Sequence, residues 1–374
     1  MHELIPSTPT RSPTPKLEPT PIGHADVKVL GLGGAGSNAV NRMIELGLSG
    51  VDFIAANTDK QALNSSLAPT RIQLGPRSTR GLGAGGDPRI GATAALESNQ
   101  DLTAALRGAD MVFITAGMGG GTGTGAAPIA AEIARENGAV VIAVVTMPFS
   151  FEMTRRAENA NLGIQKLQPH THTLITVPND KLLQIVPKDL SLEIAFRLAD
   201  DVLRQGVQGI SELITRPGLI NVDFAHVRKL LLNGGGGYLA IGLGEGPEKA
   251  HNAIQQALNH PLLELNSLDQ ATGILVQFTG GDELTLYEIG EAVNELRNTL
   301  STNVDIILGA TTEPSMAGRT QVILIVTGIG AYPMRGMARK LVAERQVEEG
   351  MVSELPAVDD LDVPAFIRKR LAIG

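Results

Sequence analysis

The feature that most restricts the fold of this chain is a glycine-rich loop that follows an apolar run. Six glycines fall within the nine residues from Gly117 to Gly125, with hydroxyls between them at Thr122 and Thr124. The run Met111–Thr115 before the loop has the composition of a buried strand, and residues 126–136 after it are typical of a helix. Consecutive amide groups in such a unit form a nest that binds anions. The loop therefore predicts a di- or triphosphate site and disfavours a flexible linker.

A second glycine-rich turn lies in VLGLGGAGSNAV, where Gly31, Gly33 and Gly36 satisfy the pattern G-x-G-x-x-G. Such a turn is typical of dinucleotide-binding folds, and Asp59, 23 residues after Gly36, stands about where those folds carry a ribose-binding acid. An NAD-dependent enzyme and a tight turn without a ligand both stay open on this pattern. A dinucleotide fold has no use for the other glycine loop, however, and neither loop is followed by Lys in P-loop spacing.

Short β-rich runs alternate with helical stretches from Asp26 onward, which predicts a parallel sheet with helices on both faces. The expected strands are Val27–Leu30, Val51–Ala55, Met111–Thr115, Val140–Val145 and Thr173–Val177. Apolar residues at helical spacing then predict one long helix over 191–216, which Pro217 and Gly218 end. A second mixed α/β region is expected from the runs Gly273–Phe278, Val304–Leu308 and Gln321–Thr327 and from helical stretches near 247–258 and 285–298.

These patterns divide the chain into six parts. We expect a disordered Pro-, Thr- and Ser-rich tail over 1–25, a first domain over 26–190, the long helix over 191–216, a second domain over 217–330, a short linker over 331–358 and a final peptide over 359–374.

Composition excludes several classes of protein. The chain has no Cys, so a disulfide scaffold and a thiolate site are excluded, and its formal net charge of −8 lacks the basic footprint of a nucleic-acid-binding protein. The longest strongly apolar run, Ala139–Met147, has nine residues, against about 20 for a membrane span. The N-terminus has no apolar stretch typical of a signal peptide. We expect a soluble cytoplasmic protein.

Several motifs together resemble the tubulin/FtsZ superfamily of GTPases. They are AANTD, GLGAGG, GMGGGTGTGAAP, VPNDKLL, VLRQGVQGISELITRPGLINVDF and IVTGIG, and the resemblance runs from about Val27 to Gly330. It implies a Rossmann-like parallel-sheet GTPase domain joined by a long central helix to a smaller mixed α/β domain. It also implies GTP or GDP as the ligand, with Mg²⁺ carried on the phosphates, and self-assembly into head-to-tail filaments of the bacterial division ring.

The resemblance also implies roles for individual residues. Asn38 would help to read the guanine, Phe196 would stack on the base, and Asp200, or its neighbour Asp201, would accept hydrogen bonds from the guanine edge. Asn179 would lie near the ribose. The full set of expected nucleotide contacts is Gly33, Gly34, Ala35, Gly36, Asn38, Asn57, Ala84, Gly85, Gly86, Gly117, Met118, Gly119, Gly120, Gly121, Thr122, Gly123, Glu152, Arg156, Asn179, Phe196 and Asp200.

Two residues near the expected nucleotide depart from the family pattern. Asp87 stands where Asn is usual, and a carboxylate beside a triphosphate is electrostatically unfavourable. Met153 replaces a Gly.

The departure with the largest expected effect lies in PGLINVDFAH, which resembles the family's catalytic loop. In the family this loop reaches the nucleotide of the neighbouring subunit, and its pattern is N-x-D-x-x-D. Asn221 and Asp223 match that pattern, but the last position is His226. Three interpretations follow: His226 acts as a water-positioning base, its presence leaves a slow GTPase that co-assembles as a structural or regulatory protein, or the position is not critical.

Two further segments lie outside the nucleotide site. The run Gly234 to Gly237 is expected to form a plain loop or to soften a strand near the subunit contact. The closing DDLDVPAFIRKR resembles the family peptide that docks onto membrane-tethering and regulatory division proteins, with Val363, Phe366 and Ile367 as apolar anchors. Its basic residues, Arg368 to Arg370, would touch acidic lipid or an acidic partner, or simply remain solvated. Contact with the membrane is therefore expected to be indirect.

Overall fold

A computed structural model of the chain describes residues 25–186, 191–216, 218–220, 222–263, 268, 270–300 and 304–329. The first part alternates strands and helices, as the sequence predicts. Its elements are β1 (Val27–Leu32), α1 (Gly33–Glu45), β2 (Asp52–Asn57), α2 (Lys60–Asn64), β3 (Thr70–Gln73), α3 (Pro88–Glu97), α4 (Asn99–Leu106), β4 (Met111–Gly117), α5 (Thr122–Glu136), β5 (Val140–Met147), α6 (Thr154–Leu167), β6 (Thr173–Pro178) and α7 (Asn179–Leu182).

A long helix and a second group of strands follow. These elements are α8 (Leu192–Thr215), α9 (Phe224–Leu232), β7 (Gly235–Glu245), α10 (Lys249–Leu258), β8 (Gly273–Gly280), α12 (Leu286–Thr299), β9 (Asp305–Thr312) and β10 (Arg319–Thr327). The expected tail over 1–25, except Ala25, and the expected linker and final peptide after 330 lie outside the described residues.

The strands form one sheet in the order β3-β2-β1-β4-β5-β6-β7-β10-β8-β9. From β3 to β6 every pair is parallel, so the carboxyl ends of these strands meet at one edge. Strands β2 and β3 follow β1 on one side, whereas β4, β5 and β6 are added on its other side. The direction of strand addition therefore reverses between β1 and β4. Ligands of such sheets bind at this reversal, outside the carboxyl ends of the strands.

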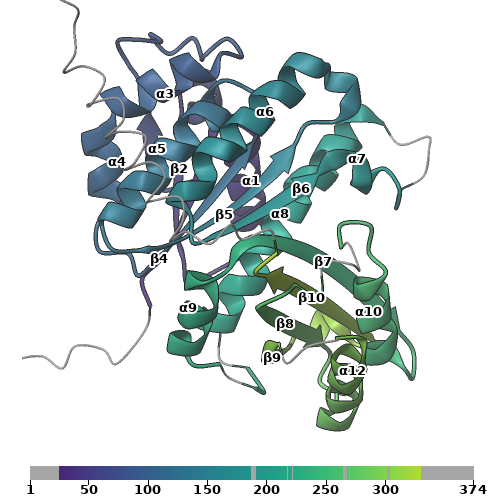
Figure 1. Cartoon of the computed structure of the whole chain (residues 1–374). Helices are drawn as coiled ribbons and strands as arrows, with labels where there is room; N and C mark the ends of the chain where they lie inside the picture. The colour runs from purple at the N-terminus through teal and green to yellow at the C-terminus, as the bar shows by residue number, and fades with distance from the viewer. Residues whose placement is uncertain are drawn as a thin grey trace, which may run out of the picture.

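Helices cover both faces of the parallel strands (Figure 1). Strand side chains alternate between the faces, so Val29 and Phe113 pack toward α1, α8 and α9, whereas Leu30 and Ile114 pack toward α3, α4, α5 and α6. Because both faces are buried, the strands read as continuous apolar runs rather than as alternating patterns. The expected α/β class with a parallel sheet is confirmed.

Helix α8 lies between the two groups of strands, within one residue of its expected bounds. Ser191 caps it by accepting a hydrogen bond from the amide of Ile194. Its two internal glycines let it approach the sheet closely: a Cβ on Gly209 would lie 2.7 Å from a side-chain carbon of Ile323. This packing accounts for glycines that would otherwise weaken a helix.

The run Gly234 to Gly237 is not a plain loop, because Gly235 to Gly237 begin strand β7. They pair in parallel with β6, where Thr173 faces Gly235 and Ile175 faces Gly237, and so join the two groups of strands edge to edge. A Cβ on Gly236 would lie 2.1 Å from the carbonyl oxygen of Ile329. The glycines are therefore needed because a third segment of backbone crosses this seam.

Candidate functional site

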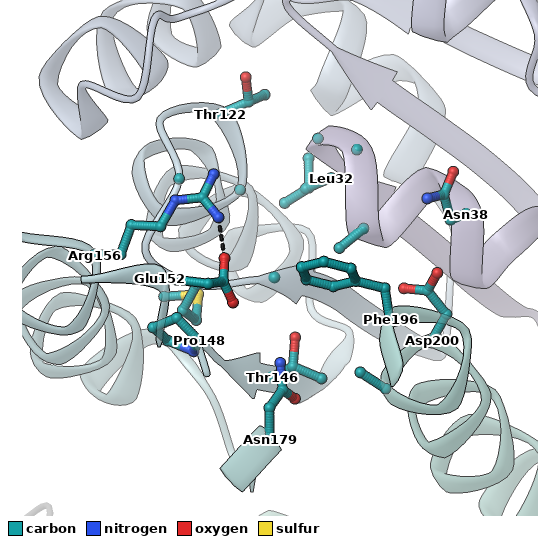
Figure 2. Close-up of a pocket in the computed structure, with 18 of the residues that line it drawn as sticks. Leu32, Asn38, Thr122, Thr146, Pro148, Glu152, Arg156, Asn179, Phe196 and Asp200 are labelled. Carbon is teal, nitrogen blue, oxygen red and sulfur yellow. Dashed lines mark hydrogen bonds and ion pairs between the residues drawn. The ribbon is translucent and has the colours of Figure 1, made fainter. Parts of the chain in front are cut away.

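A pocket of about 460 Å³ opens at the reversal point of the sheet, beside the carboxyl ends of β1, β4 and β5. Figure 2 shows its side chains arriving from α1, α6 and α8 as well as from the strand ends. The residues that line it are Leu32, Gly33, Gly34, Ala35, Asn38, Gly117, Met118, Gly120, Gly121, Thr122, Gly123, Thr146, Pro148, Glu152, Arg156, Asn179, Phe196, Ala199 and Asp200. Most of the residues expected to contact a nucleotide therefore surround one cavity.

Two helix N-termini converge at one end of this pocket. Helix α1 begins at Gly33 and α5 at Thr122, and neither has a side-chain cap or an acidic residue in its first turn. Their first amides therefore stay available, with the positive end of each helix dipole. The two starts touch, since a Cβ on Gly33 would lie 3.0 Å from the nitrogen of Gly123. This end of the pocket is suited to an anion such as a polyphosphate.

The loop between β4 and α5 is held in shape by its own hydroxyls. Gly119 has a φ of +99°, and its amide donates a hydrogen bond to Thr124 Oγ1 at 2.8 Å. Thr122 Oγ1 lies 2.6 Å from Thr58 Oγ1, which joins the loop to the end of β2. Helix α5 begins at Thr122 rather than at 126, so the last glycines of the run belong to its first turn.

The opposite end of the pocket is polar and acidic. Asp200 on α8 faces Asn38 on α1 across this end of the pocket (Figure 2). Burial raises the pKa of Asp200 to about 7, against the lowering effect of Asn38 and Arg42, and the neighbouring Asp201 raises it further. The nearby charges favour an ionised Asp201, whose carboxylate accepts from Arg204 Nε at 2.7 Å.

One wall of the pocket is built from residues after β5. Glu152 and Arg156 form an ion pair one helical turn apart, and Glu152 Oε1 also accepts from the amide of Phe149 at 2.9 Å. Met153, which follows Glu152, has φ 79° and ψ 155°, a conformation almost restricted to glycine. This backbone conformation explains why the family pattern has Gly at the position that Met153 occupies here.

Aromatic and amide side chains complete the opening. Phe196 is 38% exposed, and its ring meets Phe149 and Phe151 edge-on, with centroids 5.5 and 6.4 Å away. Figure 2 shows this ring beside Asp200. Asn179 is 4% exposed, and its Oδ1 has no hydrogen-bond partner within the described part of the chain. A buried oxygen without a partner is a candidate acceptor for a ligand hydroxyl.

Several expected contacts lie behind the pocket surface rather than on it. Gly36 is buried, and a Cβ there would lie 2.3 Å from the carbonyl of Thr115, so this glycine serves the packing of α1 on β4. Gly119 does not line the cavity either. Asn57 is 3% exposed at the end of β2, where its Oδ1 accepts from the amide of Asp59.

The loop over 81–86 also stands back from the cavity. Ala84 is buried against Gly121, whereas Gly85 and Gly86 are exposed and have φ values of 56° and 75°. Asp87 caps α3 and pairs with Arg89 at 2.7 Å, and hydrogen bonds from Arg89 lower its pKa to about 2. Its carboxylate lines a different hollow, so the repulsion expected from this substitution is compensated by Arg89.

In a dinucleotide-binding fold, Asp59 would be the acid that binds the ribose after the first glycine turn. Asp59 does not line the pocket; its carboxylate caps α2 by accepting from the amides of Gln61 and Ala62. An acid that binds a ribose would instead have to face the ligand. The position of Asp59 is therefore explained by the start of a helix.

The expected catalytic residues lie away from the pocket. Asp223 caps α9 by accepting from the amide of Ala225 at 3.0 Å, and His226 is exposed in the first turn of that helix. Helix α9 leads into Gly235, which pairs with Thr173 at the amino end of β6. The pocket stands at the carboxyl ends of the parallel strands, so the two sites lie at opposite ends of this part of the molecule (Figure 1). Asn221 lies outside the described residues.

Four lining residues were not expected from the sequence: Leu32, Thr146, Pro148 and Ala199. Thr146 and Pro148 follow the run Val140–Val145, next to β4 in the sheet. Their position at the carboxyl edge was the signal that identifies them, because neighbouring parallel strands end at the same edge.

Neither a metal-ligating cluster nor a membrane-spanning helix is present among the described residues. No group of three or more His, Asp or Glu side chains there could hold a metal ion. No described helix combines the length and the apolar character that crossing a bilayer needs.

Comparisons with known proteins agree with this geometry. The model of the Tubulin/FtsZ family, GTPase domain, matches residues 26–187, and that of the FtsZ family, C-terminal domain, matches residues 235–330. An empty FtsZ dimer from M. jannaschii is 45% identical, with a TM-score of 0.79 over 82% of this chain and 89% of that chain. GDP-bound CetZ1 from Haloferax volcanii shares the fold at 20% identity, with a TM-score of 0.69 over 86% of this chain and 99% of that chain.

Proposed function

The chain belongs to the tubulin/FtsZ family of GTPases, and from this premise we propose that it hydrolyses GTP at the contact between successive subunits of a head-to-tail filament. The main observation that supports the proposal is that the two ends of the pocket differ in charge. Two uncapped helix starts meet at one end, and Asp200 with Asn38 stands at the other. A nucleoside triphosphate has the same polarity, with its charge at one end and its base at the other.

The acidic end favours guanine. An ionised Asp200 accepts two hydrogen bonds, and guanine offers a ring NH and an amino group on one edge. Adenine has no such pair of donors on that edge. Phe196 lies beside Asp200 with an exposed ring that would stack on the base, and the unpartnered Oδ1 of Asn179 would accept from a ribose hydroxyl.

The opposite end would hold the phosphates. The amides at the starts of α1 and α5 would bind them, with Gly33 and Gly34 from one loop and Gly120 to Gly123 from the other. Arg156 is engaged by Glu152 and would contribute to the wall near the sugar. The loop with Ala84, Gly85 and Gly86 stands behind Gly121 and would close around the γ-phosphate.

Magnesium would be carried on the phosphates. The hydroxyls nearest that end, Thr58 Oγ1 and Thr122 Oγ1, are neutral, and no acidic cluster is found among the described residues. A hard divalent cation accepts phosphate and water oxygens as ligands, so this donor set fits an ion bound with the nucleotide. The ion would neutralise charge on the phosphates.

Hydrolysis would need a second copy of the chain. Among the described residues, two carboxylates line the pocket: Asp200, at the base end, and Glu152, which is paired with Arg156. Helix α9, which Asp223 caps and which contains His226, stands at the opposite end of the parallel strands (Figure 1), where a head-to-tail neighbour would present both residues to the phosphates. There Asp223 would polarise the attacking water and His226 would position it, with Asn221 beside them. A slow GTPase is the alternative, and family membership does not favour it.

In the cell this filament would form part of the division ring. The segment 359–374 would dock onto tethering and regulatory proteins through Val363, Phe366 and Ile367, so contact with the membrane would be indirect. This localisation and these partners follow from the family resemblance of the final peptide.

Assembly and hydrolysis can be tested with three proteins. The wild-type chain should sediment with GTP and not with GDP, and should release phosphate. Asp223→Asn keeps a cap for α9 and should sediment normally while its phosphate release falls about 100-fold. Asp200→Asn should lose GTP-dependent sedimentation. Phosphate release that persists in Asp223→Asn would contradict the proposed role of the loop.

A further inference from the structure

A second hollow, of about 600 Å³, lies between α3, α5 and α6 on the sheet face opposite α8. It is separate from the nucleotide pocket, with which it shares no lining residue. We call it the α3–α6 groove. Its lining residues are Asp87, Pro88, Arg89, Ala92, Thr124, Gly125, Pro128, Ile129, Arg155, Asn159, Leu162, Gly163 and Lys166.

The charge of the α3–α6 groove is positive. Arg89, Arg155 and Lys166 stand around one carboxylate, Asp87, which is already paired with Arg89 at 2.7 Å. No carboxylate of the described residues lies within ion-pair distance of Arg155 or Lys166, and both side chains are exposed. The groove thus has two cations available to an acidic ligand.

The surface between these cations is apolar. Pro128, Ile129 and Leu162 contribute to it, and Leu162 is 56% exposed. The helices approach closely here because a Cβ on Gly163 would lie 2.4 Å from the Thr124 methyl group. An occupant that matches both features is an extended segment in which acidic and apolar side chains are interspersed.

The chain itself contains such a segment. Residues 348–363, EEGMVSELPAVDDLDV, carry six carboxylates and no cation, with apolar side chains between them. The described chain ends at Ile329, and the intervening residues 330–347 could extend over about 60 Å. We propose that residues 348–363 dock in the α3–α6 groove of the same chain when the final peptide, which overlaps them at 359–363, is not bound to a partner.

A segment docked in the α3–α6 groove would contact residues that are hydrogen-bonded to the glycine loops of the nucleotide pocket. Asn159 lines the groove, and its Nδ2 donates to the carbonyl oxygens of Gly86 and Gly119, each at 3.4 Å. Thr124, another lining residue, accepts from the amide of Gly119. The effect of docking on the nucleotide pocket rests on the proposed function, whereas the docking itself does not. The docking is therefore tested on unassembled protein in the presence of GDP.

The absence of Cys from the chain allows a clean cross-linking test. Leu162→Cys in the groove is combined with Leu355→Cys in the acidic segment of the full chain, and disulfide formation is followed under mild oxidation. The matched control combines Leu46→Cys with Leu355→Cys, because Leu46 is 61% exposed and follows α1 on the other face of the sheet. We expect the groove pair to form an intrachain disulfide at least ten times faster than the control pair.

Reversing the charge of the groove distinguishes specific docking from random collision of the two cysteines. Adding Arg155→Glu and Lys166→Glu should reduce the rate of the groove pair to that of the control, and high salt should reduce it as well. Circular dichroism would establish that the charge-reversed chain is folded. The proposal would be overturned if the two pairs formed disulfides at equal rates, or if the rate of the groove pair did not respond to charge reversal. Disulfides formed mainly between two chains would also overturn it, because they would indicate a second copy as the occupant.

Discussion

Asn38 on α1 and Asp200 on α8 face each other at the end of the pocket away from the glycine loops. Burial raises the pKa of Asp200 to about 7, so without a ligand this carboxyl group is about half protonated at neutral pH. Guanine offers two donors to it and would bind the ionised form.

Binding of GTP should therefore release a proton and should tighten as the pH rises. Between pH 6 and pH 8 the ionised fraction of a group with a pKa of about 7 increases about tenfold, and we expect the affinity to increase about as much. Calorimetric titration with GTP in buffers of different ionisation enthalpy measures the proton release. Asp200→Asn should bind weakly with no proton release. An affinity that does not change over this range would contradict the predicted linkage.

The same group affects stability in the opposite direction. Its folded pKa lies above its unfolded value of about 4, so its stabilising contribution is complete below pH 4 and is lost as the pH rises through about 7. The nucleotide-free wild type should lose more stability between pH 6 and pH 8 than Asp200→Asn does. Thermal unfolding at both pH values, with nucleotide removed, gives the comparison, and identical pH dependences would contradict it.

Met153 has a backbone conformation that favours glycine, with φ 79° and ψ 155°. Such strain costs about 1–3 kcal/mol, and glycine removes it while adding some freedom to the unfolded chain. We expect Met153→Gly to raise the free energy of unfolding by about 1 kcal/mol. Met153→Ala is the matched control, because it removes the same exposed side chain but keeps a Cβ, and it should show no gain. Thermal or denaturant unfolding distinguishes the two.

The seam between β6 and β7 should be sensitive to one methyl group. Gly236→Ala would place a Cβ 2.1 Å from the carbonyl oxygen of Ile329, a backbone atom that cannot rotate away. We expect a loss of about 2 kcal/mol or more in stability. Gly290→Ala is the control, since no atom of the described residues would lie within 4 Å of a Cβ at that position in α12, and it should be neutral or slightly stabilising. Equal effects of the two substitutions would show that the seam is not tightly packed.

His226 is exposed at the start of α9, three residues after Asp223, so its substitution should leave the fold intact. If it positions the attacking water, His226→Ala should lower phosphate release about 100-fold with GTP-dependent sedimentation unchanged. His226→Asp should be no faster than the wild type. A large acceleration in His226→Asp would instead support the slow, co-assembling GTPase.

Much of the fold was predictable from the sequence because the parallel strands are buried on both faces. Their apolar runs stand out, and the sequence of the long helix α8 has a capping residue, Ser191, before it and a proline, Pro217, after it. Short, half-buried elements such as β3 carry little signal. The glycines of β7 were the hardest to interpret, because a glycine needed for a close backbone crossing looks the same in sequence as one needed for a loop.

The candidate site was predictable to a similar degree. The glycine loops identify the end of the pocket where backbone amides are concentrated. They do not reveal which glycines face the cavity: Gly34 lines it, whereas Gly36 packs between α1 and β4. Asn57 and Ala84, which are also expected to contact the nucleotide, lie behind the residues that line the cavity. Such differences depend on side-chain direction, which a motif does not contain.

The most direct test of the account is the rate of GTP hydrolysis per subunit as a function of protein concentration. Helix α9, with Asp223 and His226 at its start, lies away from the pocket at the other end of the parallel strands, so a single subunit should be almost inactive. Phosphate release per subunit should stay near zero up to a threshold concentration and rise above it together with sedimentation. A rate per subunit that is constant on dilution through that threshold would contradict it.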